Sequence, residues 1–260
     1  MDAMEISQYI AALDEDGSLL ADAARTAGLD AAVPTCPGWQ VRDLVRHQAY
    51  IHRWAMRHVL ERPAEVIDDH DTEADILGGG PPDGELLAAY REGHAALVQA
   101  LREADPGVRC ATFMNTAPTP LGFWARRQAH ETAIHRFDAQ SALPGGGPSP
   151  AGAFEPGFAD DGIDELIMGF AMTRRYRPRN GREQSLAVRP DDTPGRWHLR
   201  IGESGAEVSQ GDRDADCVIE GPASGLYALL WNRGTVDTAK ARVTGDPAVL
   251  GTWGGVRVRW

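Results

Sequence analysis

Three side chains of types that bind metal ions occur in two distant segments of this 260-residue chain. His47 lies in DLVRHQAYIHRW, while Glu131 and His135 lie in RRQAHETAIHRFDA. Glu131 and His135 are four residues apart, so one helix can present both to the same cation. His47 shares a helical stripe with Leu44 and Ile51, which predicts that it points into a bundle core. Two imidazoles and one carboxylate are typical of an open, catalytic metal site.

Helical spacing alone leaves a second interpretation open. A carboxylate stands four residues before a histidine at Asp43 and His47 and again at Glu131 and His135, and the composition by itself would produce about one such pair. An exposed ion pair within one helix is the alternative explanation for Glu131 and His135. Asp43 is either a carboxylate that orients an imidazole or a solvated acid of the first helical turn.

Other polar and aromatic residues flank these segments. Arg126 and Arg127 precede Glu131 by about one turn, and they either bind a carboxylate or are solvated. Trp39 stands directly before the helix that carries His47, and we expect it to contribute to bundle packing. The sequence contains neither a GxGxxG segment after a strand nor a GxxxxGK[ST] segment, so a nucleotide cofactor is not indicated.

The bulk properties exclude several classes of protein. A formal charge of −12 should repel nucleic acid and anionic membrane surfaces. The N-terminal segment has no basic region followed by an apolar stretch, and no run approaches the length of a membrane helix, so we expect a cytoplasmic protein. The three cysteines, Cys36, Cys110 and Cys217, are widely separated and lack CxxC spacing, which indicates reduced thiols rather than disulfides or a zinc knuckle.

The first half of the chain has helical periodicity. Apolar stripes predict helices over about 6–20, 41–60, 86–101 and 120–142, which together indicate a four-helix bundle over residues 1–145. Such bundles often build metal sites from residues on facing helices. The stretch PGGGPSPAGAFEPG is rich in glycine and proline and predicts a linker, which we place at 146–160.

The remaining residues, 161–260, predict a smaller α+β domain. A helical pattern in DDGIDELIMGFAMTRRY precedes four short strand-like runs, QSLAVRPD, RWHLRIGE, AEVSQ and DCVIEG. A further helix follows in ASGLYALLWNRG, and DPAVLGTWGGVRVRW predicts a final turn and strand. The expected fold class is therefore α+β with two domains.

Three segments carry a family resemblance: VPTCPGWQVRDLVRHQAYIHRW, WARRQAHETAIHRFDA and YALLWNRG with the later VTGDPAVLGTW. They resemble the mycothiol-dependent maleylpyruvate isomerase family, which belongs to the superfamily of DinB-like metal-binding four-helix bundles. The motifs PGW…RD…H and HE…HR.DA are specific in combination, and the resemblance spans nearly the whole chain. It implies a DinB-like bundle followed by an α+β domain similar to sterol carrier proteins.

The resemblance also implies ligands and site residues. His47, Glu131 and His135 would bind a divalent metal, zinc above all, and the thiol cofactor would be mycothiol. Arg233 in LWNRG matches an arginine that is implicated in the family's catalysis, although WNR stands here where the family commonly has WGR. The implied partners are a small-molecule substrate and a low-molecular-weight thiol.

Three functions are compatible with these residues. The first is a thiol-dependent isomerase or S-transferase, in which a metal-activated thiolate adds to an electrophilic substrate. The second is a non-catalytic module that binds a small molecule. The third is a metal-dependent hydrolase that uses water in place of the thiol.

Overall fold

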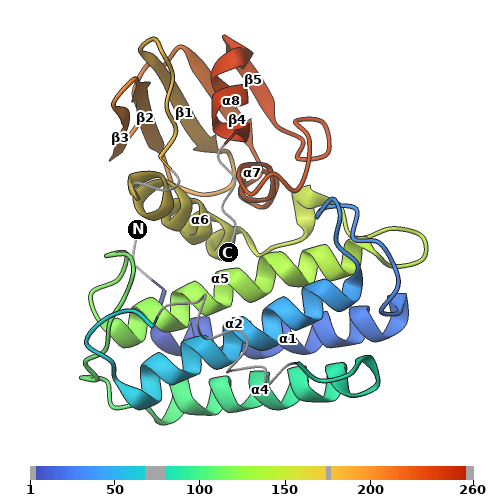
Figure 1. The fold of residues 1–260 in the computed structure, drawn as a ribbon. Helices are drawn as coiled ribbons and strands as arrows, with labels where there is room; N and C mark the ends of the chain where they lie inside the picture. The colour runs from blue at the N-terminus through green and yellow to red at the C-terminus, as the bar shows by residue number, and fades with distance from the viewer. Residues whose placement is uncertain (1–3, 68–79, 174–176, 256–260) are drawn as a thin grey trace. The chain divides into compact units, whose positions relative to one another are not determined.

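The computed structural model describes residues 4–67, 80–173 and 177–255. The chain divides into two compact units, Met4–Pro148 and a second unit that contains Ser149–Trp260. The first unit is a four-helix bundle, and the second is an α+β domain with one five-stranded mixed sheet (Figure 1), which confirms the predicted fold class. Among the residues described, no helix is both long enough and apolar enough to cross a membrane.

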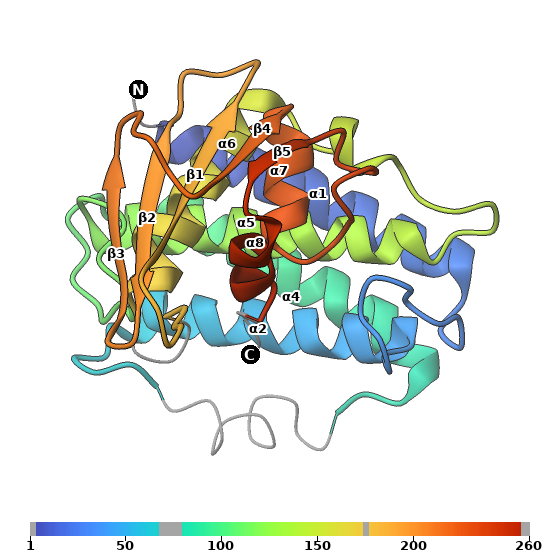
Figure 2. The same cartoon turned by 90° about the horizontal axis from the view of Figure 1, so that it is seen from above.

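Four long helices of similar length lie side by side in the bundle (Figure 2). They are α1 (Ile6–Ala27), α2 (Val41–Glu61), α4 (Asp83–Glu103) and α5 (Pro120–Ser141). The α1 helix packs chiefly against α5, and α2 packs chiefly against α4. Their apolar stripes meet in the interior, as the helical periodicity predicts.

Local capping interactions fix the starts of the two helices that carry the candidate metal ligands. At the start of α2, the Asp43 carboxylate accepts a 2.8 Å hydrogen bond from the backbone N–H of Gln40 and forms a capping box. Asp43 is therefore an acid of the first helical turn. At the start of α5, the Thr119 side chain accepts a hydrogen bond from Gly122, and Pro120 occupies the first turn.

The α5 helix is buried along nearly its whole length, over residues 121–139. Its charged side chains therefore need partners, because an unpaired buried charge is costly. Arg126 donates a 2.7 Å hydrogen bond to the carbonyl of Thr116, and Arg136 forms a 2.8 Å ion pair with Asp16 of α1. The Arg136–Asp16 ion pair also joins α5 to its neighbour α1 in the bundle.

The second unit builds its sheet in the order β3-β2-β1-β4-β5. The strands are β1 (Gln184–Pro190), β2 (Trp197–Gly202), β3 (Gly205–Gln210), β4 (Cys217–Gly221) and β5 (Arg242–Gly245). The β1–β4 pair is parallel, and the other three pairs are antiparallel. The helical elements are η1 (Pro150–Gly152), α6 (Pro156–Asp164), η2 (Glu165–Gly169), η3 (Phe170–Met172), α7 (Ala223–Leu230) and α8 (Pro247–Gly254).

Several details of this unit differ from the sequence-based expectations. The predicted single helix consists of α6, a π-helical turn η2 and a 3₁₀ turn η3, and its last residues, 174–176, lie outside the described residues. The expected final turn is instead the helix α8, and the expected last strand, at 256–260, also lies outside them. The β5 strand was not predicted, because an edge strand of four mostly exposed residues lacks an apolar alternation.

A buried histidine links α1 and α4 inside the bundle. His94 is 5% exposed, and its Nε2–H donates a 3.0 Å hydrogen bond to the carbonyl of Leu13. A Cβ atom at Gly17 would lie within 2.1 Å of the His94 Nε2 atom, so the close approach of the two helices requires glycine there. The His52 ring lies 5.4 Å away from that of His94. Burial lowers the pKa of His94, although the hydrogen bond to Leu13 and the charge of Asp14 oppose this effect.

We expect His94 to make the bundle less stable in acid. Because the pKa of His94 is lower in the folded protein than in the unfolded chain, the unfolded state binds more protons below about pH 6.5. The free energy of unfolding should therefore fall as the pH falls from 6.5 to 5.5, by at most about 1.4 kcal/mol for each such histidine. Denaturant titrations at these pH values should show a shallower fall for His94→Gln, which keeps a donor but cannot titrate. An equal fall in the free energy of unfolding for both proteins between pH 6.5 and 5.5 would contradict this expectation.

Candidate metal centre

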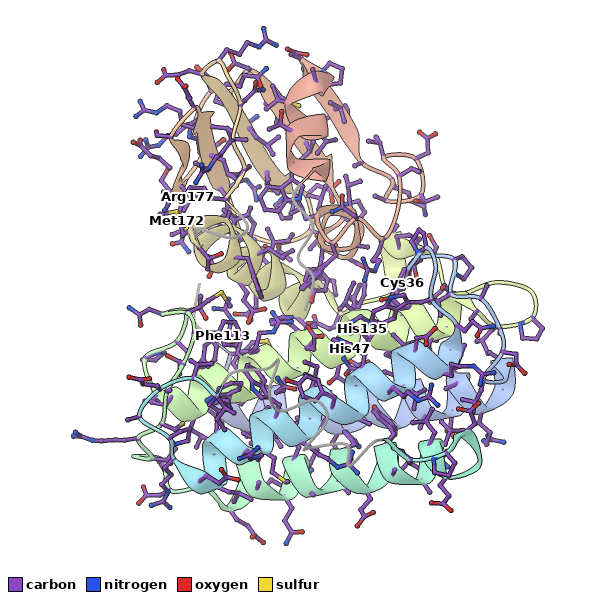
Figure 3. The ribbon with its side chains drawn as sticks, viewed as in Figure 1. Cys36, His47, Phe113, His135, Met172 and Arg177 are labelled. Atoms are coloured by element: carbon purple, nitrogen blue, oxygen red, sulfur yellow. The ribbon has the colours of Figure 1, made fainter. Side chains whose placement is uncertain are left out.

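The structure brings the three predicted ligands together from two helices. His47 projects from α2 and His135 projects from α5 (Figure 3). Glu131 lies one turn before His135 on the same face of α5. The Glu131 Oε1 atom lies 3.1 Å from His47 Nε2 and 3.2 Å from His135 Nε2. One ligand atom from each of the three residues lies within 4.8 Å of the others. The alternative of an exposed ion pair is wrong, because the Glu131 side chain is only 2% exposed and that of His135 only 9%.

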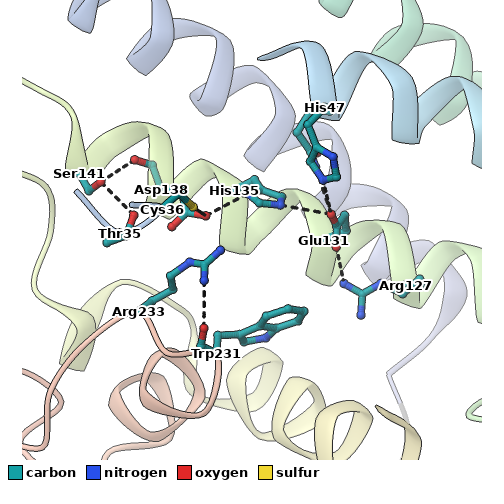
Figure 4. A network of polar contacts seen from close by, with 11 residues as sticks. Thr35, Cys36, His47, Arg127, Glu131, His135, Asp138, Ser141, Trp231 and Arg233 are labelled. Carbon is teal, nitrogen blue, oxygen red and sulfur yellow. Dashed lines mark hydrogen bonds and ion pairs between the residues drawn. The ribbon is translucent and has the colours of Figure 1, made fainter. Parts of the chain in front are cut away.

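Arg127 compensates the charge of Glu131 from one turn earlier on α5. Its Nη2 atom lies 3.0 Å from Glu131 Oε2, and both side chains are buried (Figure 4). Glu131 therefore uses one oxygen for the guanidinium and the other for the two imidazoles and for the Gln48 amide, whose Nε2 donates a 3.4 Å hydrogen bond to Oε1. Of the two alternatives for Arg127, the structure selects carboxylate binding, and the carboxylate is that of Glu131 itself.

The surroundings of Glu131 favour its ionised form. Burial would raise the pKa of Glu131, but the hydrogen bonds with His135 and His47 and the positive charge of Arg127 together hold it well below its ordinary value. A carboxylate that stays ionised at neutral pH is a competent metal ligand.

The donor set fits a divalent cation. The separations of 3.1 and 3.2 Å between ligand atoms are close to the edge of about 3.3 Å expected for tetrahedral zinc with nitrogen and oxygen ligands. Imidazole and carboxylate ligands suit zinc and several other first-row transition metals. Three protein ligands leave at least one coordination position for a substrate or water.

Sequence reasoning missed four residues that contact this centre, one of which is the buried Gln48. The Trp39 ring stacks on that of His135, with centroids 6.1 Å apart and planes 11° apart, and meets the His47 ring at 64°. Asp138 Oδ2 lies 2.9 Å from His135 Nδ1 and accepts a 3.2 Å hydrogen bond from Cys36 Sγ. The spacing of His135 and Asp138 by three residues could have indicated their contact. No local pattern could have indicated the contacts of Trp39 and Cys36.

Arg233 lies in the second unit, shortly after the end of α7. It is half-buried, and its side chain donates a 3.1 Å hydrogen bond to the carbonyl of Trp231. The preceding residue, Asn232, has a φ of 59° and thus a left-handed backbone. Asparagine tolerates this conformation better than most residues other than glycine. The WNR segment can therefore keep the backbone that a glycine would adopt at that position.

Two family models together match most of the chain. The mycothiol maleylpyruvate isomerase N-terminal domain matches residues 10–140, and the MDMPI C-terminal domain matches residues 158–252. The first match includes all three candidate metal ligands, and the second includes Arg233. No curated protein matches the sequence.

Solved structures support the same fold. A crystal structure of the mycothiol-dependent maleylpyruvate isomerase is similar at a TM-score of 0.61 and 12% sequence identity, covering 89% of this chain and 90% of that chain. A histidine-to-alanine mutant of that isomerase gives the same TM-score, identity and coverage. At this identity the likeness concerns the fold.

The candidate centre predicts that the protein binds about one divalent cation per chain. Glu131→Gln should lower the affinity for zinc strongly, since the substitution removes the only anionic ligand of the three while keeping its shape. Chelator competition, followed by elemental analysis of the desalted protein, measures this change. His198→Ala, on β2 of the second unit, is the matched control and should bind zinc like the unmodified protein. Equal zinc content in Glu131→Gln would refute the assignment.

Proposed function

Because the chain belongs to the mycothiol maleylpyruvate isomerase family, we propose that it is a metal-dependent enzyme that activates mycothiol for addition to an electrophilic small molecule. The observation that carries this proposal is the convergence of His47, Glu131 and His135 from two helices. The convergence supports an open site, which a thiol sulfur can enter as a further ligand.

In this proposal, His47, Glu131 and His135 hold a divalent cation, with zinc as the expected metal. Such a cation, when bound, stabilises the thiolate far more than the thiol, so that a nucleophile is available at neutral pH. Arg127 keeps Glu131 oriented, since it binds Oε2 and leaves Oε1 facing the two imidazoles. Trp39 covers the two rings and restricts their rotation.

The proposed reaction is a reversible addition. Mycothiol, when bound, would supply the nucleophile: its thiolate sulfur would form a bond to one carbon of a cis double bond in an unsaturated keto acid, and the π electrons would move to the conjugated carbonyl. The former double bond would then be a single bond, free to rotate. Return of these electrons would break the carbon–sulfur bond and release the thiolate and the trans isomer. If the adduct instead expels a leaving group from carbon, the same first step gives S-transfer.

Arg233 is proposed as the catalytic arginine, on its match to the family position. A guanidinium binds a carboxylate through two parallel hydrogen bonds and stabilises the negative charge that develops on an enolate. Arg233 would therefore both bind the keto acid and lower the barrier to thiolate addition. The Nη1 atom of this guanidinium donates the hydrogen bond to the carbonyl of Trp231, and the residue before Arg233, Asn232, has the left-handed backbone.

The proposed function predicts turnover that requires both metal and thiol. With maleylpyruvate as substrate, isomerisation followed by ultraviolet absorbance should need added mycothiol and should fall by about 10²-fold or more in His47→Ala, because that variant loses a metal ligand. His198→Ala should retain full activity. A metal-loaded protein that hydrolyses its substrate equally well without thiol would instead favour the hydrolase. Retention of a small molecule with no thiol reaction of any kind would favour a binding module.

Arg233→Met should lower kcat by about 10²-fold, since the transition state loses a charged hydrogen-bond donor, and should also raise KM for a carboxylate substrate. Arg200→Met is the matched control, because Arg200 is an exposed arginine of the same unit that pairs with Glu207. Steady-state kinetics of both variants at saturating thiol measure the effect. Equal loss in the two variants, or loss in neither, would remove Arg233 from the mechanism.

A further inference from the structure

The Nδ1 atom of the His135 ring is directed away from the candidate cation position, toward a second carboxylate. His135 Nε2 lies 3.2 Å from Glu131, and His135 Nδ1 lies 2.9 Å from Asp138 Oδ2 (Figure 4). Asp138 follows His135 by three residues on α5, and it is fully buried. The imidazole is therefore held between two carboxylates from the same helix.

This arrangement selects one tautomer of His135. An ionised carboxylate only accepts hydrogen bonds, so Nδ1 carries the proton that it donates to Asp138. The lone pair of the neutral ring is then on Nε2, which faces Glu131 and His47. Carboxylates behind metal-binding histidines commonly fix the ring orientation and the basicity of the ligand in this way.

The Asp138 carboxylate is itself held by the loop between α1 and α2. Cys36 Sγ donates a 3.2 Å hydrogen bond to the same Oδ2 atom that accepts from His135. Thr35 Oγ1 lies 3.1 Å from Ser141 Oγ, and Ser141 Oγ donates a 2.6 Å hydrogen bond to the carbonyl of Asp138. The loop thus contacts the last turn of α5 at Asp138 and at Ser141.

The same loop also supplies the aromatic wall of the centre. Backbone hydrogen bonds from Cys36 to Val33, from Trp39 to Cys36 and from Val33 to Trp39 close a compact turn. Trp39 therefore has a fixed position relative to Cys36. Its ring stacks on that of His135. A change at Cys36 can accordingly reach the metal ligand through Asp138 and through Trp39.

We propose that Asp138 is the positioning residue for His135, and that the Cys36 thiol holds Asp138 in place, so that the loop between α1 and α2 controls how tightly the centre binds its metal. This inference rests on the proposed metal site but assigns functions to two residues outside the ligand set. Neither residue needs to touch the substrate.

A competing arrangement would use the same atoms differently. Cys36, His135 and Asp138 also place one ligand atom each within 4.8 Å of the others, so a cation could bind among them through His135 Nδ1. A neutral imidazole offers only one lone pair, and the two arrangements therefore exclude each other. The position of Nε2 between Glu131 and the His47 ring, whose centroid lies 5.0 Å from that of His135, favours Nε2 as the ligand atom.

Binding of cobalt(II) to the full chain, without added thiol, tests the proposal. Asp138→Ala should weaken cobalt binding by about 10- to 100-fold in chelator competition, and should change the visible d–d spectrum as the ring reorients. Asp22→Asn is the control, since it alters an exposed acid of the same bundle that pairs with Arg91. Its affinity and spectrum should match those of the unmodified protein.

The thiol is tested by a pair of substitutions. Cys36→Ala removes the donor and should weaken cobalt binding by about 3- to 10-fold. Cys36→Ser keeps a donor and should restore most of the affinity, whereas a purely space-filling role would not distinguish serine from alanine. Cys110→Ser, in the same unit, should have no effect.

The outcomes separate this inference from the proposed function. If the unmodified protein binds no cobalt, the metal site itself fails, and this inference fails with it. If the unmodified protein binds cobalt and Asp138→Ala does so with equal affinity and spectrum, only the positioning role is overturned. A sulfur-to-cobalt charge-transfer band that disappears in Cys36→Ala would show that Cys36 is a ligand, which also overturns it. Should Asp138→Ala not fold, Asp138→Asn and the ¹⁵N shifts of His135 in the zinc-loaded protein report the tautomer directly.

Discussion

The carboxylate of Glu131, buried within a helical bundle, is the group on which the rest of the centre depends. A buried anion is unfavourable unless it is paired, and Arg127 supplies one compensating charge from the preceding turn. The other oxygen faces His47 and His135, which together form a candidate site for a cation. The same electrostatic requirement therefore explains the buried arginine and makes these three residues suitable ligands for a cation.

The bundle satisfies this requirement through one helix that is almost wholly enclosed. The α5 helix contributes two candidate ligands, the compensating Arg127 and the outer carboxylate Asp138, all in four successive turns. The neighbouring α2 helix contributes only His47, and its start is fixed by the capping box of Gln40 and Asp43. Precision at the centre thus comes from rigid helices whose ends are defined locally.

Thiol chemistry places particular demands on such a centre. A cation with two neutral ligands and one anionic ligand retains a net positive charge and an open position, and both features favour a thiolate over a thiol. The loop that carries Cys36 and Trp39 closes one side of the ligand set and contacts it through hydrogen bonds and ring stacking. The PGW motif lies in this loop, and its tryptophan is Trp39. The motif therefore has a structural role, since Trp39 contacts the rings of His47 and His135.

The sequence by itself determined the elements of the fold and the identity of the candidate ligands. Helical periodicity placed both ends of α2, α4 and α5 to within about three residues, although α1 extends seven residues beyond its predicted end. The spacing of Glu131 and His135 placed both on one face, because this feature depends only on local geometry. Local patterns were less informative where burial does not alternate, as in the edge strand β5 and the helix α8. The tertiary structure alone decided that His47 meets this pair and that Cys36 reaches Asp138. The contact of Arg127 with Glu131, four residues apart on α5, lies within the reach of local spacing, and only its burial depends on the tertiary structure. Contacts between residues about 80 or more positions apart depend on how helices pack, and local periodicity contains no information about that packing.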